Sequence, residues 1–286
     1  MKSNNLSAVF NVSQYASLER STNIQRFAEA FILFILLLCL WAQYAFIGNI
    51  LNSRGTNYIN LITLPLDHDL AFSTFWSLFY SAALIIPFVF VWILFIFSRF
   101  NLLLIYRLFL SCLLILIIHY IIYFLFPTCK ILWQDPGFSA FWQQIQTPGF
   151  LNRNTQFVMS ITTPWNSFPS YHIGSAWIIL RFTFARFKIL GSLFLIWFIG
   201  MCLGTITLKV HVIMDGIAAI IISELCYQLF KIPRIVHYVN KFSDIHPRKP
   251  ILCIYLCCIL IGAPLVLYEL IYIKPMTVPE FVRLSS

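Results

Sequence analysis

Two histidines and one aspartate are the residues of this sequence whose types and spacing suggest chemistry. His172 and His211 each lie at the edge of a long apolar run, and Asp215 follows His211 by four positions. An ionisable side chain at membrane depth costs roughly 3 kcal/mol or more, so such residues usually belong to a working site. Positions i and i+4 share a face of a helix, so we expect the Asp215 carboxylate to hold one nitrogen of the His211 ring and leave the other as a nucleophile or base.

The residues before His172 favour a helix that begins at that point. Pro169 precedes it, and Ser170 is a suitable N-cap residue. The free N–H groups and the positive dipole end of a helix N-terminus bind phosphate, and a histidine there can donate a proton to a leaving oxygen. We therefore predict a phosphoryl-transfer site in which His211 attacks phosphorus, Asp215 orients it and His172 protonates the departing alcohol.

The composition predicts that these residues are positioned by membrane helices. Of the 286 residues, 60% are hydrophobic and only 10% are charged, which is too apolar for a soluble domain of this length. A bilayer crossing takes roughly 20 apolar residues. An all-α, polytopic transmembrane bundle is expected from seven apolar runs, of which the fourth is short and carries Arg181: Phe27–Gly48, Phe72–Phe97, Leu102–Phe126, His172–Phe184, Ile189–Thr207, Val212–Phe230 and Ile251–Ile273.

This topology makes a geometric prediction about the two histidines. His172 opens the fourth helix and His211 opens the sixth, two crossings later, so both are expected at one depth on the side opposite the N-terminus. With seven crossings, 13 of the 19 Lys and Arg residues fall on the N-terminal side. The positive-inside rule then puts the N-terminus in the cytoplasm and the site on the extracytoplasmic side, periplasmic or lumenal. Anionic lipid head groups explain the cytoplasmic charge, and no basic stripe indicates nucleic acid.

The rest of the chain predicts a single domain without a metal site. Residues 1–25 form a polar N-terminal segment, and residues 26–286 form one transmembrane domain whose catalytic core spans about 64–230. The stretch Thr128–Tyr171 is expected to be a long functional loop. Of the eight cysteines, only Cys129 lies outside the apolar runs, and no metal-ligand spacing occurs. No metal and no other cofactor is expected.

Four short strings in this sequence resemble one family of membrane enzymes. PSYHIGSA (169–176) and HVIMD (211–215) resemble the PSxH and HxxxD elements of the type 2 phosphatidic acid phosphatase superfamily. LPLDHDL (64–70) and the FP that closes the third helix resemble the branch of inositol phosphorylceramide synthases and sphingomyelin synthases. The resemblance covers roughly residues 64–230. It implies a six-helix core, here with one further helix, no metal, and a site that faces away from the cytoplasm.

The sequence also departs from the phosphatase members of that family. They carry a Ser-Arg pair ahead of the nucleophilic histidine, where this chain has Gly204 and Thr205. A phosphomonoester dianion usually needs a bidentate arginine, so a phosphodiester fits this site better. The candidates for substrate contacts are Ser170, Lys209, Arg153, Thr205 and Lys130.

We therefore favour a lipid head-group phosphotransferase over a lipid phosphate phosphatase, which acts on phosphatidic acid or a polyprenyl phosphate. A non-catalytic lipid transporter is a weaker alternative. The expected partners are a lipid phosphoester and the surrounding membrane lipids; the sequence does not identify the lipid or the oligomeric state. Two other histidines have simpler explanations, because His119 suits a packing role in a membrane helix and His68 a solvated loop.

Overall fold

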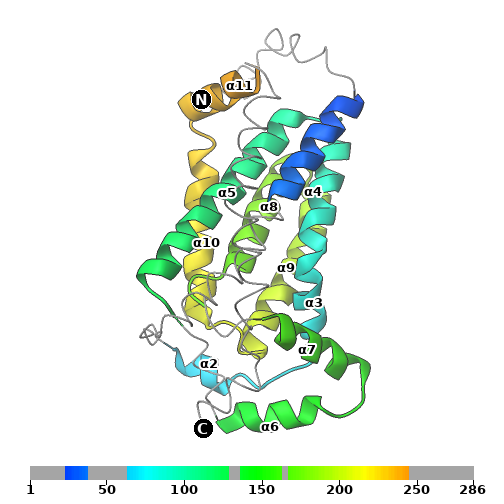
Figure 1. The fold of residues 1–286 in the computed structure, drawn as a ribbon, viewed down its shortest axis with the longest axis vertical. Helices are drawn as coiled ribbons and strands as arrows, with labels where there is room; N and C mark the ends of the chain where they lie inside the picture. Colours follow the sequence, from blue (N-terminus) through cyan, green and yellow to red (C-terminus); the bar gives the residue numbers. More distant parts are fainter. Residues whose placement is uncertain (1–22, 38–62, 129–135, 163–166, 245–286) are drawn as a thin grey trace, which may run out of the picture.

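The described part of the chain is all-α, as predicted. The computed structural model describes residues 23–37, 63–128, 136–162 and 167–244, and it has no strand within these ranges. Residues 23–37 form a helix that precedes the labelled elements of Figure 1. The labelled helices are α2 (Pro65–Asp69), α3 (Ser77–Ser81), the 3₁₀ helix η4 (Ala82–Leu84), α4 (Ile86–Phe97), α5 (Leu102–Leu125), α6 (Pro136–Ile145), α7 (Phe150–Ile161), α8 (Tyr171–Arg186), α9 (Lys188–Thr207), α10 (Ile213–Leu229) and α11 (Pro233–Asp244).

Helix α8 lies at the centre of the bundle and packs against α4, α5, α9 and α10. Its buried face contributes Ile178 and Ile179 to a core shared with Leu116 of α5 and Met201 of α9. The outer faces are apolar as well: the exposed side chains of the bundle include Ile117, Ile121, Ile189, Ile196 and Ile221. Helices that are apolar on every face are typical of membrane spans.

Two of the described helices, α5 and α9, are long and apolar enough to cross a bilayer. The bounds of α5, α9 and α10 agree with three of the predicted runs to within a residue or two, and α8 extends the short fourth run at both ends. Arg181 lies within α8, where its guanidinium stacks 4.9 Å from the ring centre of Tyr227. The residues beyond 37 in the first run and the whole seventh run lie outside the described residues.

The second predicted run, Phe72–Phe97, is not one helix. It is divided into α3, η4 and α4, and Pro87 stands in the first turn of α4. Proline has no N–H to donate and its ring clashes with the preceding turn, so the helix ends before it and starts again. The apolar run concealed this break because its residues stay hydrophobic on both sides of it.

The stretch expected to be a long loop, Thr128–Tyr171, contains helices. Its described residues form α6 and α7, which lie across the lower end of the bundle in Figure 1, beside α2. Helix α11 lies at the opposite end. The side chains predicted to do chemistry lie towards the end covered by α2, α6 and α7.

Candidate active site

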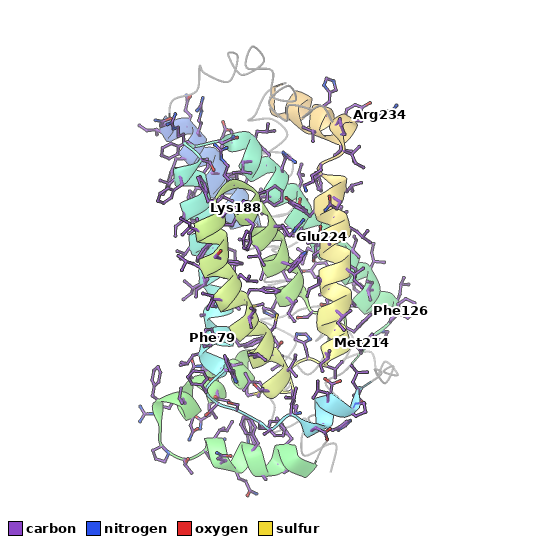
Figure 2. All side chains as sticks on the ribbon, turned by 180° about the vertical axis from the view of Figure 1, so that it is seen from behind. Phe79, Phe126, Lys188, Met214, Glu224 and Arg234 are labelled. Atoms are coloured by element: carbon purple, nitrogen blue, oxygen red, sulfur yellow. The ribbon has the colours of Figure 1, made fainter. Side chains whose placement is uncertain are left out.

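The two halves of the candidate site come from the N-terminal ends of α8 and α10. Figure 2 labels Met214, which lies at the lower end of α10, close to the α2 end of the molecule. The loop after α9 brings His211 to this place, and Val210 N and His211 N both donate to the Thr205 carbonyl, at 3.0 and 3.2 Å. The short turn therefore holds the histidine rigidly just ahead of α10.

The predicted His211–Asp215 pair is present and fully buried. His211 Nδ1 lies 3.0 Å from Asp215 Oδ2, and the two side chains are 1% and 0% exposed. The same oxygen accepts the Ser167 hydroxyl at 2.7 Å and the Val212 N–H at 3.2 Å. Because a carboxylate only accepts hydrogen bonds, it selects the His211 tautomer with the proton on Nδ1, which leaves the Nε2 lone pair free of that proton.

His172 lies beside His211, as the topology predicted. The two ring centres are 6.5 Å apart, and the His172 ring is 5.5 Å from the ring of Tyr80. His172 is half-buried, whereas His211 is only 2% exposed. The two rings that were predicted to act together are therefore neighbours in the described structure.

The start of α8 is capped by its own Ser170 and held by two other parts of the chain, α5 and α10. Ser170 is its N-cap and accepts the Ile173 N–H at 3.5 Å, while Ser170 N donates to the Asp215 carbonyl at 3.3 Å. The Tyr123 hydroxyl donates to the Pro169 carbonyl at 2.7 Å from the end of α5. The predicted cap is confirmed, and the bond from Ser170 ties the beginnings of α8 and α10 together; the phosphate contact of Ser170 stays a prediction.

Asp67 is a site residue that the sequence reasoning missed. It is 0% exposed, and its carboxylate accepts the Leu64 N–H and the Ile213 N–H, each at 2.8 Å. The second bond satisfies a free N–H at the N-terminus of α10, two residues after His211. Pro65 in the first turn of α2 followed by an acid in the same turn is a helix-start signal that the sequence does contain. Its long-range partner, however, depends on the tertiary fold.

Lys209, like Asp67, connects α2 to the segment around the start of α10. Its ammonium group donates to the carbonyls of Asp67 and Leu70, the latter at 2.7 Å, and it lies 5.4 Å from the ring centre of Phe72. The residue is 4% exposed and has a left-handed backbone, with φ at 54°. Lys209 thus fastens the His211 loop to α2, and its predicted contact with substrate stays a prediction.

Three substrate-contact candidates remain: Thr205 and Arg153, which the structure describes, and Lys130. Thr205 is fully buried and its hydroxyl donates to the Cys202 carbonyl at 2.7 Å. A Cβ atom on Gly204 would come within 2.6 Å of the Trp76 carbonyl oxygen, so the segment from α9 packs directly against the backbone before α3. Arg153 lies on an exposed face of α7. Lys130 lies outside the described residues.

Of the other four histidines, His119 is expected to have a packing role and His68 to lie in a solvated loop. His119 is buried in α5, and its Nδ1 lies 2.8 Å from the Ile115 carbonyl, consistent with the predicted packing role. His68 is exposed, as expected, but it lies in the short helix α2 and not in a loop, and its Nε2 lies 3.2 Å from the Thr63 hydroxyl. Within the described ranges, no three His, Cys, Asp or Glu side chains are grouped so that they could hold a metal ion. The expectation of a metal-free reaction stays a prediction.

Comparison with protein-family models gives one match, over residues 52–229, to the family described as the PAP2 superfamily. The match contains α2 to α10 and therefore every described residue of the candidate site. No curated protein and no solved structure matches the chain.

Proposed function

The chain belongs to the PAP2 superfamily, and from that premise we propose that it transfers a phosphoester group from a membrane lipid through a phosphohistidine at His211. Membership supports a phosphatase or phosphotransferase type of reaction on a lipid. One observation carries the rest of the proposal: the buried His211–Asp215 pair, with the His172 ring centre 6.5 Å from that of His211.

In the first step, the Nε2 lone pair of His211 attacks phosphorus and the bond from phosphorus to the leaving oxygen breaks. His172 gives its proton to that oxygen, so an alcohol departs. Asp215 keeps the Nδ1 proton of His211 in place and stabilises the positive charge that develops on the ring. The products of this step are the free alcohol and a phosphorylated His211.

In the second step, an acceptor hydroxyl attacks the phosphohistidine while neutral His172 takes its proton. The N–P bond of His211 breaks and the new phosphoester leaves, which restores both histidines. Water as acceptor gives hydrolysis, and a lipid hydroxyl gives a new head-group lipid. The N–H groups at the start of α8, capped by Ser170, would hold the phosphoryl oxygens in both steps.

The charges around the site favour a phosphodiester donor, and therefore head-group transfer. Position 205, where the phosphatase members carry arginine, is a fully buried threonine here, and the neighbouring Gly204 has no room for a side chain. The nearby Lys209 ammonium already binds two backbone carbonyls. A phosphodiester carries one negative charge fewer than a phosphomonoester dianion, so it needs less positive charge from the protein. This supports the reaction type of the sphingolipid synthase branch.

We further propose that the site faces away from the cytoplasm. The excess of Lys and Arg on the N-terminal side of the seven expected crossings supports this orientation. Accessibility of cysteines introduced at exposed positions of α6 and α11, measured in sealed membrane vesicles, would test it. Labelling of the α6 cysteine from the cytoplasmic side would contradict it.

The reaction is tested with purified protein in liposomes and two labelled donors. With phosphatidylinositol as donor and ceramide as acceptor, we expect a new phosphosphingolipid by mass spectrometry and no free phosphate. With phosphatidic acid, release of inorganic phosphate would instead identify a phosphatase. The His211→Ala variant should do neither, and wild-type turnover by that variant would falsify the mechanism.

A further inference from the structure

A second cluster of charged side chains lies between α8 and the far end of α10, away from the candidate catalytic residues. The Arg181 guanidinium carbon lies 4.9 Å and the Lys231 ammonium nitrogen 4.4 Å from the centre of the Tyr227 ring. The two cationic groups are therefore within about 9 Å of each other, the sum of these distances. Tyr227 follows Asp215 on α10 by about 18 Å at the rise of an α-helix. The cluster thus belongs to the end of α10 that is remote from the site.

The Tyr227 ring is a fixed support for the two cations. It is 4% exposed, and the Phe182 ring packs edge-on against it, with the ring centres 5.2 Å apart. Arg107 of α5 donates to the Phe230 carbonyl at 2.7 Å, which fixes the end of α10 directly ahead of Lys231. A cation is attracted to the face of an aromatic ring without giving up an N–H donor. Both cations are therefore positioned while their donors stay available for an anion.

The cluster has more positive than negative charge. Its carboxylate is Glu224, which lies 3.1 Å from Arg181 Nε without the alignment of a hydrogen bond. The Glu224 oxygens accept instead from the Trp177 indole and the Gln228 amide. Within the part of the chain that the structure describes, neither Arg181 nor Lys231 donates a hydrogen bond from its cationic group. Two cations and one carboxylate leave one positive charge uncompensated.

The surroundings of the cluster suit a phospholipid better than a soluble anion. Tyr227 stands two positions before the end of α10, and tyrosine is enriched where a membrane meets water. Nearer the middle of α10, the outward-facing Ile221 and Leu225 are 55% and 65% exposed. A long cationic side chain at such a place extends toward the phosphates while its stem lies on apolar surface. A ligand here meets charge at the helix end and apolar side chains beside it, which is the order of parts in a phospholipid.

We propose that Arg181 and Lys231 bind the phosphate of an anionic phospholipid in the leaflet opposite the candidate active site. A phosphodiester carries one negative charge, which matches the one uncompensated positive charge, and its oxygens accept from the guanidinium fork and the ammonium group. Basic pockets between transmembrane helices are suited to anionic lipid head groups. The acyl chains lie against Leu225 and Ile221. This lipid is a bound partner and not a substrate, so the inference goes beyond the proposed function and does not depend on it.

Native mass spectrometry of the purified protein with added phosphatidylglycerol tests the site. This lipid has one phosphodiester charge and no ammonium group, so it should bind more tightly than phosphatidylcholine. Arg181→Gln and Lys231→Gln should each weaken its binding by about 5-fold, the contribution of one Lys or Arg near a charged lipid surface. Glu224→Gln should strengthen binding by about the same factor, because it removes the negative charge that opposes the phosphate. Unchanged binding in both cation variants would overturn the proposal.

The matched control is Arg186→Gln. Arg186 is on the same helix as Arg181 and also lies against an aromatic ring, 5.7 Å from the centre of Phe187. In the described structure no second cation is placed against that ring, so the control should bind phosphatidylglycerol as the wild type does. An equal loss in Arg186→Gln would show that total charge is sufficient, and it would overturn the specific site.

Two further arms identify the ligand and separate this site from the reaction. Inorganic phosphate at the same concentration as the lipid should not displace phosphatidylglycerol; displacement would mean a site for a soluble anion and would overturn the lipid proposal. The variants should give the same pattern on a His211→Ala background, so a failed mechanism and a failed lipid site give different results. If Arg181→Gln does not fold, Lys231→Gln decides alone, because Lys231 is exposed beyond the end of α10.

Discussion

Helix α10 carries two carboxylates in different surroundings, and they show how a candidate site residue differs from one that joins helices. Asp215 in its first turn is fully buried and collects donors from His211, Ser167 and Val212 on one oxygen. Glu224, higher on the same helix in Figure 2, is about one-third exposed. Two residues of α8, Trp177 and Arg181, contact the Glu224 carboxylate.

Glu224 joins α10 to α8 through its Oε2 and bonds within α10 through its Oε1. Its Oε2 accepts the Trp177 indole N–H at 2.9 Å and lies 3.1 Å from Arg181 Nε, although that N–H does not point along the line between the two atoms. Its Oε1 accepts from the Gln228 amide at 2.5 Å. An exposed ion pair of this kind contributes little, whereas a buried carboxylate that fixes a histidine decides where a proton stands. Burial and the identity of the partner, rather than charge, separate the two roles.

The largest effects are expected from the two histidines. His211→Ala and His172→Ala should each lower turnover of a lipid phosphoester by several orders of magnitude, because the reaction needs both a nucleophile and an acid. An activated ester separates their roles: p-nitrophenolate departs without protonation, so His172→Ala should still form acid-labile phosphohistidine from such a donor. His211→Ala should form none. Phosphohistidine in the His211→Ala protein would show that another residue is the nucleophile.

Asp215→Asn compared with Glu224→Gln tests the contrast directly. Both changes remove one negative charge from α10 and keep the shape of the side chain. Asp215→Asn should lower kcat by about 10³-fold to 10⁴-fold, because the amide no longer selects the Nδ1–H tautomer of His211. Glu224→Gln should leave kcat within about 2-fold, as expected for a substitution away from the site. Steady-state kinetics of the two purified variants would decide, and equal losses would mean that both carboxylates act only through the fold.

Asp67→Asn should have an intermediate effect. The clamp from Asp67 to Ile213 N positions the residues that follow His211, and a shift of the order of 1 Å in a reacting group costs about 10²-fold in rate. We expect kcat to fall by about 10-fold to 100-fold with the fold retained. The matched control is Asp69→Asn, because Asp69 is exposed in the same short helix. Equal kinetics of the two variants would remove Asp67 from the site.

The features that sequence alone predicted are those set by local rules. The four-residue spacing predicted the contact of Asp215 with His211, although His211 lies in the turn ahead of α10 and not within that helix. The alternation of membrane crossings predicted that His172 lies at the same end of the bundle. The length of the apolar runs located α5, α9 and α10. Each of these conclusions depends on residues close together in the sequence or on the number of helices between two positions.

The features that sequence missed depend on distant partners or on a local break within an apolar run. In the sequence, Asp67 is one of two acids beside a histidine. Only the fold brings the Ile213 N–H to its carboxylate. From the sequence, Lys209 is a cation that could bind phosphate. In the structure, its ammonium group donates to two backbone carbonyls of α2 and the residue that follows it. Pro87 is visible in the sequence as a proline, but hydrophobicity does not change there, so hydrophobicity alone predicts one helix.

The smallest effect is expected for the ion pair of Glu224 with Arg181. A double-mutant cycle of Arg181→Met and Glu224→Gln should give a coupling free energy of about 0.2 to 1 kcal/mol, because the two side chains are 36% and 31% exposed and solvent weakens the attraction. Reversible denaturation in detergent, monitored at low and high salt, would measure it, and added salt should lower the coupling. A coupling above about 2 kcal/mol would mean that lipid or detergent shields this pair from water. If the two single variants and the double variant all retain kcat, the Arg181–Glu224 pair plays no part in the reaction. If only the double variant loses activity, the pairing of α8 with α10 at Glu224 controls the position of the histidines at the N-terminal ends of these helices.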